Sequence, residues 1–321
     1  MGDGIARLPA RNIPAPVGVS DHAAKVLAAD LLPPGRYPAL DDPEGWRRLV
    51  AKRDRVRAEE SAPVLEKLQV DVEARTMGGR PVYVATPRGA RLTNRGHVLL
   101  DIHGGALVFG GGEINVRFSA ASMALRTGCV AYSIDYRVPP DHPYPAALDD
   151  CMEFYRDMLA DHRPGEIVFS GASAGGNLAA AALLRARAEG LPMPAGAILR
   201  TPELDLTESG DSFHTLMGLD VVLPASLMEV NRLYAGGADL ADPYLSPLFG
   251  DVSGFPPTWL QAGTRDIFLS NTVRMHRKLR AAGVRADLHV WEAMPHGGFG
   301  GAAPEDREVS AEMATFVASL G

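Results

Sequence analysis

The chain has 321 residues, of which 46% are hydrophobic and 22% are charged, and its formal net charge is −7. This composition is typical of a globular protein with a sizeable core. Acidic residues outnumber basic ones by 39 to 32, which argues against a surface that neutralises phosphates. We therefore expect no nucleic-acid partner.

Several features bear on where the protein works. Residues 1–16 hold no continuous apolar segment of the kind that forms a secretory signal, and Ala6 breaks the myristoylation pattern. No run approaches the ~18 apolar residues of a membrane span. Cys129 and Cys151 lie in apolar segments without metal-ligand spacing, so we expect buried, reduced thiols, with a disulfide as the minor alternative. These features predict a cytoplasmic protein.

The first part of the chain is predicted to be helical. Residues 21–27 and 42–67 have helical patterns, separated by the proline-rich residues 31–35. Strand-like segments follow at 70–74 and 81–85, and the turn at Gly78-Gly79 could pair them.

After these segments, apolar strands alternate with helices. Such alternation predicts a mostly parallel sheet, here of eight strands, with helices on both faces. The later predicted strands are residues 97–102, 130–134, 167–170, 196–200, 258–261 and 286–290. The predicted helices are residues 117–127, 146–160, 176–189, 270–282 and a final apolar stripe over 309–320.

Residues 203–250 interrupt this alternation with a loop-rich excursion that includes a helical stretch at 225–234. An excursion of this length between two strands is more typical of a lid than of a linker. We therefore predict a helical cap segment at 1–66 and a catalytic domain at 67–321, with 203–250 contributing to the cap.

The most informative motif is G-A-S-A-G at residues 171–175, between an apolar strand and an alanine-rich helix. This is the context of a nucleophile elbow, a sharp turn that exposes the serine oxygen above a sheet. Glycines on both sides allow the tight turn. We therefore predict Ser173 as a covalent nucleophile.

A serine hydroxyl needs a base within hydrogen-bond reach and a carboxylate that orients the base. His296 lies in a Pro/Gly loop after the last predicted strand, whereas His289 lies inside that strand and His276 in a basic helix. Asp266 follows the strand at 258–261, between the serine and the histidine in the chain. The order Ser173, Asp266, His296 is the one α/β-hydrolases use.

The segment His103-Gly104-Gly105 follows the strand at 97–102. A loop of this kind offers backbone N–H groups to a developing oxyanion. We predict an oxyanion hole formed by Gly104, Gly105 and Ala174, with His103 as an anchor of the loop. The glycines at 110–112 lack the lysine of a phosphate-binding loop, so we expect them to provide only flexibility.

From about residue 80 onward the chain resembles the hormone-sensitive-lipase-like carboxylesterases, a family of α/β-hydrolases. The motifs that carry the resemblance are HGG at 103–105, YRVPPDHPYPAA at 136–147, GASAGGN at 171–177, DLT at 205–207, DPYLSP at 242–247, GTRD at 263–266 and PH at 295–296. The chain departs from the family at Ala106, where a third glycine is usual, and at Ala172, where Asp is frequent. If φ is negative at Ala106, we expect the backbone donors to survive the alanine, giving a functional oxyanion hole with altered crowding on the acyl side.

The resemblance implies an α/β-hydrolase fold with a helical cap and a serine carboxylesterase that acts on small to medium acyl esters through an acyl-enzyme. We expect the cap to form an apolar pocket that includes Phe109 and residues near 216–219. The expected partner is a small-molecule ester, with no metal or organic cofactor and a monomeric or homodimeric state. Two alternatives stay open: a lactonase or amidase with the same triad, and a non-catalytic receptor on this fold. The presence of His296 disfavours the receptor, since the plant gibberellin receptor that resembles this family lacks that histidine.

Overall fold

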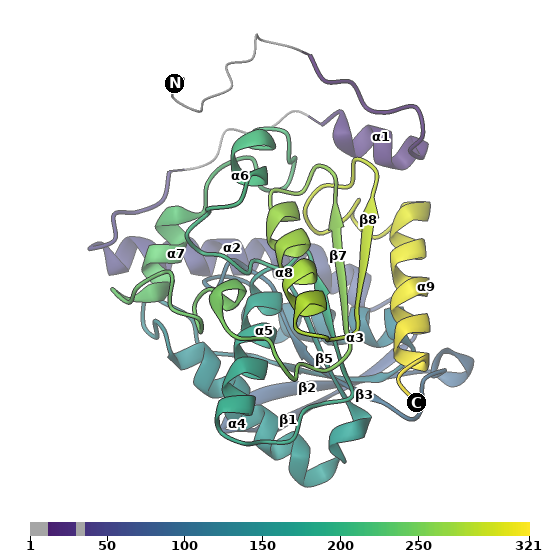
Figure 1. The fold of residues 1–321 in the computed structure, drawn as a ribbon. Helices are drawn as coiled ribbons and strands as arrows, with labels where there is room; N and C mark the ends of the chain where they lie inside the picture. The colour runs from purple at the N-terminus through teal and green to yellow at the C-terminus, as the bar shows by residue number, and fades with distance from the viewer. Residues whose placement is uncertain (1–11, 30–35) are drawn as a thin grey trace.

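A computed structural model describes residues 12–29 and 36–321. The predicted break at 31–35 thus lies outside the described residues. One eight-stranded sheet runs through the molecule in the order β1-β2-β4-β3-β5-β6-β7-β8 (Figure 1). All eight predicted strands are confirmed, and they form a single mostly parallel sheet.

The antiparallel edge begins with a hairpin. Strands β1 (Val70–Met77) and β2 (Arg80–Pro87) pair antiparallel, and Gly78 and Gly79 between them both have positive φ. The predicted pairing is therefore confirmed. Strand β2 then pairs antiparallel with β4 (Val130–Ile134).

The other neighbouring pairs are parallel. These strands are β3 (Val98–Ile102), β5 (Ile167–Ala172), β6 (Gly196–Arg200), β7 (Thr258–Gly263) and β8 (Ala286–Trp291). Strands buried on both faces have nearly continuous apolar sequences, which is why residues 167–169 read Ile-Val-Phe. Their carboxyl ends lie on one side of the sheet, where ligands bind in open α/β sheets.

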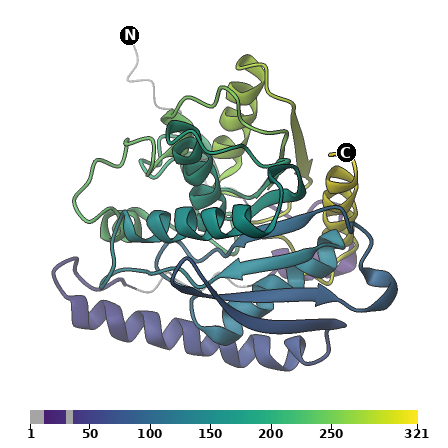
Figure 2. The same ribbon diagram turned by 90° about the horizontal axis from the view of Figure 1, so that it is seen from below.

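Helices cover both faces of the sheet. One face packs against α3 (Glu113–Thr127) and α9 (Pro304–Ala318), whose buried side chains include Val116, Met123 and Phe316. The opposite face packs against α4 (Ala146–Asp161), α5 (Ala174–Ala188) and α8 (Leu269–Ala281). The two layers are visible on either side of the strands in Figures 1 and 2.

Near the N-terminus, α1 spans Asp21–Leu27 and α2 spans Pro43–Leu65. The second helix begins where the sequence supplies a start signal: the Asp42 side chain accepts a hydrogen bond from the N–H of Gly45, and Pro43 occupies the first turn. Figure 2 shows α2 as a long helix running beside the sheet.

The excursion at 203–250 contains α6 (Ser212–Thr215), α7 (Met228–Ala235) and the 3₁₀ turn Pro247–Phe249. A small apolar cluster joins it to the N-terminal helices: Trp46 of α2 and Val230 of α7 pack with Val108 and Phe109, which follow β3. The division into a cap segment and a catalytic domain stays a prediction that this packing supports.

Candidate active site

Ser173 occupies the turn between β5 and α5, with φ 57° and ψ −124°. Such a backbone conformation is rare for a residue with a side chain and persists only where the surroundings enforce it. A Cβ on Gly171 would lie 2.2 Å from the carbonyl oxygen of Gly175, and one on Gly175 would lie 1.9 Å from that of Ile102. The two glycines of the motif are therefore required by close backbone contacts.

The loop after β3 lies directly against this turn. A Cβ on Gly104 would lie 2.8 Å from the carbonyl oxygen of Ala172 and 3.3 Å from Cβ of Ser173. Ala174 is the first residue of α5, so its N–H has no partner within the helix. The backbone of Gly104 and the N–H of Ala174 thus approach Ser173 from two sides.

His103 is fixed in place by several contacts. Its Nδ1 lies 2.9 Å from the carbonyl oxygen of Gly104, and its ring stacks on Tyr136 with 4.1 Å between centroids. The Tyr136 hydroxyl donates to the carbonyl oxygen of His103 at 2.9 Å. Burial lowers the pKa of His103 to about 4, so the ring is neutral near pH 7. These contacts support the predicted role of His103 as an anchor.

Ala106 does not have the negative φ on which the expected survival of the backbone donors depended. Its φ is 52° and that of Leu107 is 62°, so both residues are left-handed. The loop folds back tightly here, since the N–H of Phe109 donates to the carbonyl oxygen of Gly105 at 2.7 Å. A side chain in this conformation costs about 1–2 kcal/mol, which explains why glycine is usual at this position.

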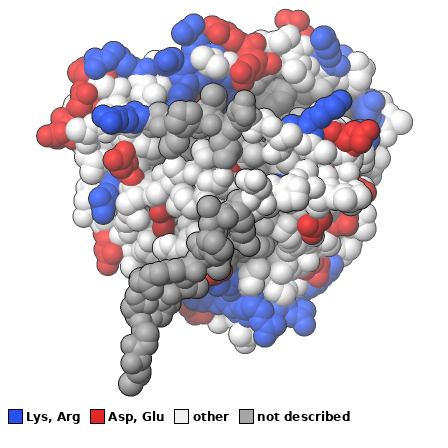
Figure 3. Space-filling view, turned by 90° about the horizontal axis from the view of Figure 1, so that it is seen from above, with Lys and Arg blue, Asp and Glu red and all other residues white. Residues whose placement is uncertain are grey.

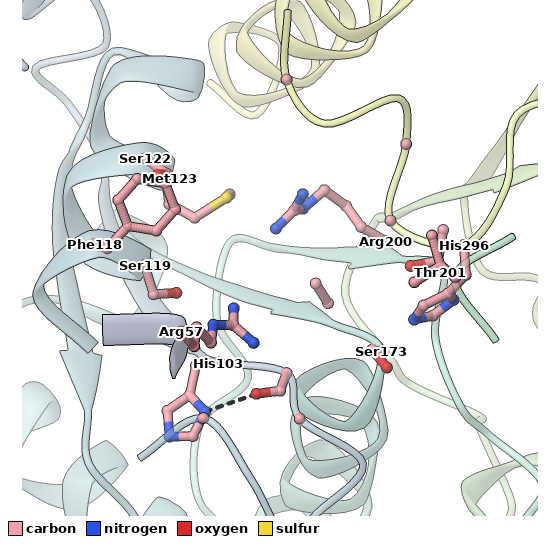
Figure 4. Close-up of a pocket in the computed structure, with 18 of the residues that line it drawn as sticks. Arg57, His103, Phe118, Ser119, Ser122, Met123, Ser173, Arg200, Thr201 and His296 are labelled. Atoms are coloured by element: carbon pink, nitrogen blue, oxygen red, sulfur yellow. Dashed lines mark hydrogen bonds between the residues drawn. The ribbon is translucent and has the colours of Figure 1, made fainter. Parts of the chain in front are cut away.

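The side chains of His296 and Asp266 are hydrogen-bonded to each other near Ser173. The Nδ1 of His296 lies 3.1 Å from Oδ1 of Asp266, which also accepts from the N–H of Phe268 at 2.9 Å. Asp266 is fully buried and His296 is 7% exposed. In Figure 4 the ring of His296 and the side chain of Ser173 lie beside one another at one end of the pocket.

Asp220, in the 203–250 excursion, also contacts this pair and was not singled out from the sequence. Its carboxylate accepts from the N–H of Ile267 at 3.1 Å and from the N–H of His296 at 3.3 Å to each oxygen. Asp220 thus links the loop that carries Asp266 and the loop that carries His296 to the 203–250 excursion. No sequence pattern marks this aspartate, because its partners lie 47 and 76 residues away.

Nearby carboxylates decide the protonation of His296. Burial by itself lowers the pKa of His296, but the charge and hydrogen bond of Asp266, with a smaller contribution from Asp220, raise it above 6.5 overall. A buried imidazolium is therefore stabilised, as a general base that gains a proton during the reaction requires.

Glu203 is a second residue that sequence reasoning missed. It is 1% exposed, and neither carboxyl oxygen forms a hydrogen bond of good geometry among the described residues; the side chain of Asn231, near it, lowers its pKa slightly. Its N–H donates to the carbonyl oxygen of Ser173 at 3.2 Å. Burial raises the pKa of Glu203 to about 8, so the carboxyl group is mostly protonated at pH 7.

The other histidines considered from the sequence have different surroundings. His289 lies in β8 and pairs with Glu312, and its ring stacks on Trp259. His276 lies on α8. Neither lines the pocket that contains Ser173 and His296.

That pocket has a volume of about 1040 Å³. Phe109 lines it as predicted, but residues 216–219 do not. Val222, Leu223 and Leu227 line it instead. Leu216 packs beneath this wall against an apolar cluster that includes Phe213 and Phe268. The apolar residues of the excursion can be identified in the sequence, but the path of an irregular loop decides which of them line the pocket.

The cysteines, possible metal ligands, long helices and surface charges were also located in the structure. Cys129 and Cys151 are buried and free. Among residues 12–29 and 36–321, no group of three or more His, Cys, Asp or Glu side chains could hold a metal ion. None of the helices in the same ranges is both long and apolar enough to cross a membrane. Viewed from above, acidic and basic side chains lie mostly around the rim of the molecule, and the visible centre is largely uncharged (Figure 3).

Comparison with known proteins agrees with this architecture. Residues 99–299 match the α/β-hydrolase fold family, and the chain belongs to that family. An esterase of Acinetobacter venetianus is 32% identical over 80% of this chain and 88% of its own length. An acetyl-hydrolase of Streptomyces hygroscopicus is 32% identical over 63% of this chain and 68% of its own length.

Solved structures place the chain within a narrower group. The crystal structure of esterase E25 superposes with a TM-score of 0.87 and 34% identity, covering 98% of both chains. An esterase from the bacterial hormone-sensitive lipase family superposes with a TM-score of 0.77 and 30% identity, covering 94% of this chain and 99% of its own. The resemblance inferred from the motifs is thereby confirmed.

Proposed function

We propose that this protein is a serine carboxylesterase with the triad Ser173, His296 and Asp266. The observation that carries the proposal is the hydrogen bond between His296 Nδ1 and a buried carboxylate, at the wall of the pocket onto which Ser173 opens. The names of the relatives, esterases and acetyl-hydrolases, support the same reaction class.

In the proposed reaction, Nε2 of His296 takes the proton of Ser173 as the serine oxygen attacks the ester carbonyl. Asp266 holds the ring through Nδ1 and stabilises the charge that the ring gains. His296 then gives the proton to the leaving alcohol, and an acyl-enzyme remains. Water repeats the two proton transfers and releases the acid.

The oxyanion that forms at the carbonyl needs donors positioned in advance. We assign this role to the N–H groups of Gly104, Gly105 and Ala174, because the backbone of this loop and the start of α5 converge beside the serine. Loss of one such donor typically costs ~10²–10³ in rate.

The pocket supports small to medium esters as substrates. Its walls include the apolar side chains of Phe109, Val222 and Leu227, which suit an acyl chain. Its volume of about 1040 Å³ lies just above the usual range of pockets for compact organic ligands, ~300–1,000 Å³.

The test compares wild type with Ser173→Ala on p-nitrophenyl esters of increasing acyl length, and on a lactone and an amide of similar size. We expect Ser173→Ala to lower kcat by ~10³-fold or more on the ester series. Ser253→Ala, at an exposed serine, is the matched control. Equal rates for wild type and Ser173→Ala would exclude the proposed nucleophile. Turnover of the lactone or the amide but not the esters would favour the alternative hydrolase.

A further inference from the structure

One side chain of the pocket is not needed by the proposed triad. Arg200 is the last residue of β6, and its carbonyl oxygen accepts from the N–H of Ser173 at 2.9 Å. Its side chain lines the same pocket as Ser173. Figure 4 shows the guanidinium extending away from Thr201 and His296, into the space between them and Ser122 and Met123 of α3.

This guanidinium lacks a counter-ion among the described residues. Its Nε is buried and has no hydrogen-bond partner there. Burial lowers the pKa of Arg200 to about 10, and the nearby charge of Arg126 acts in the same direction. Arg200 still carries its positive charge near neutral pH.

The nearest acid is already occupied. Asp101 is the only carboxylate that raises the pKa of Arg200, and its oxygens accept hydrogen bonds from the hydroxyls of Ser119, Ser133 and Ser170. These bonds hold Asp101 within the core at the end of β3. Its charge offsets that of Arg200 only from a distance.

The pocket as a whole has an excess of positive charge. Its lining contains three aspartates, of which Asp306 accepts from the backbone N–H groups of Phe299 and Gly301, and Asp54 from that of Gly110. It also contains five arginines, at positions 53, 57, 126, 200 and 307. None of the five forms an ion pair with these aspartates among the described residues.

A partly buried cation without a partner carries a desolvation cost, and a ligand that supplies the missing charge offsets that cost. A guanidinium presents a planar set of N–H donors that suits carboxylate and phosphate. Arg126 adds a second cation, since the charges of the two arginines interact. Among the described residues Arg126 donates to Ser310 Oγ at 3.3 Å, and Asp306 offsets part of its charge without forming an ion pair.

We propose that this pocket takes esters carrying an anionic group, a carboxylate or a phosphate, which binds at Arg200 while the ester lies at Ser173. Arg126 contributes a second positive charge to the same end of the pocket. This inference rests on the proposed function and narrows its substrate class. It predicts half-esters of dicarboxylic acids, or esters of hydroxy acids or phosphorylated alcohols, as better substrates than neutral esters of the same size.

The test uses pairs of substrates that differ in charge but not in length. Monoethyl glutarate is compared with its carboxamide, ethyl 4-carbamoylbutanoate, which places the group on the acyl side. On the alcohol side, 3-acetoxypropanoate is compared with its carboxamide, 3-acetoxypropanamide. The addition of 2-acetoxyethyl phosphate distinguishes a phosphate from a carboxylate. Acid release is followed by NMR. We expect wild type to favour at least one anionic ester by ~10–100-fold in kcat/KM, the range of a charged hydrogen bond.

Arg200→Met removes the charge and keeps much of the side-chain length. We expect it to reduce the anionic-to-neutral ratio of kcat/KM to about one, and Arg200→Lys to retain part of the preference. Arg277→Met, on the exposed side of α8, removes one arginine outside the pocket and should leave the ratio unchanged.

Two results separate the inference from the proposed function. If wild type hydrolyses the neutral esters without any preference for the anionic ones, or if Arg200→Met keeps the wild-type ratio, the inference is wrong and the esterase proposal stands. If wild type hydrolyses none of the esters, charged or neutral, the esterase proposal itself is wrong.

Discussion

Glu203→Gln should make the protein more stable, by an amount that depends strongly on pH. Glu203 is buried beside the site, and its carboxyl oxygens form no hydrogen bond of good geometry among the described residues. Burial raises its pKa from 4.5 to about 8. Between these values the folded protein holds a proton that the unfolded chain has released, so the free energy of unfolding falls as pH rises.

The size of the effect follows from the same two pKa values. A difference of 3.5 units, from 4.5 to about 8, corresponds to about 5 kcal/mol at ~1.36 kcal/mol per unit, lost in full only above the folded pKa. At pH 7 the loss is about 3 kcal/mol, because only ~2.5 units have been crossed. Glutamine keeps the shape of the protonated side chain and cannot ionise, so the variant avoids this loss.

The assay is thermal or urea unfolding of wild type and Glu203→Gln at a series of pH values from 5 to 9. Near pH 5 we expect a small difference in the free energy of unfolding, growing steadily to pH 8 and then levelling off. At ~2 °C per kcal/mol, the Tm difference should widen by several degrees. Glu229→Gln, at an exposed position on α7, should show no such trend. A difference between wild type and Glu203→Gln that stays constant across the pH range would refute the reasoning.

Three further predictions concern the site. Because Asp266 and Asp220 outweigh burial, kcat/KM should fall on acidification with an apparent pKa above 6.5. Asp220→Asn should move that limb of the pH–rate profile to lower pH, and an unshifted limb would show that Asp220 does not act on His296. Asp266→Asn should lower kcat by ~10²–10⁴-fold with little change in KM, measured by steady-state kinetics, and a change confined to KM would contradict its role. Gly175→Ala should lower the free energy of unfolding by about 3 kcal/mol or more in urea. Gly165→Ala is the control, since Gly165 has open space around it and the substitution should have little effect. Equal urea midpoints for the two variants would argue against the close packing of the elbow.

The order of elements was predictable because the sequence carries it locally. The buried strand at 167–169, the glycines of the turn and the alanine-rich helix after it are adjacent in the chain, so the elbow at Ser173 needed no tertiary information. The partners were predictable from their position after strands, since carboxyl ends of parallel strands gather at one edge. The order along the chain then selected Asp266 and His296.

Features that depend on tertiary burial were not predictable. Arg200 and Glu203 are charged residues near the end of a strand, and nothing nearby in the sequence indicates that Glu203 is buried or that Arg200 lines the pocket. Asp220 acts through loops far away in the chain. Ala106 is left-handed because the loop turns tightly between Gly105 and Phe109. The only hint of this turn in the sequence is that relatives usually have glycine at position 106. The cap boundaries and the oligomeric state stay predictions.

The packing of α2 has a mechanical consequence. Oδ1 of Asp54 accepts from the N–H of Gly110 at 2.6 Å, and the guanidinium of Arg53 lies 4.5 Å from the centre of the Phe109 ring. One helix therefore both walls the pocket and fastens the far end of the loop that begins at Gly104.

Because α2 is bonded to Gly110, any displacement of this helix would be transmitted to the loop that carries Gly104 and Gly105. The rigidity of the proposed oxyanion donors therefore depends on a helix that lies about fifty residues earlier in the chain.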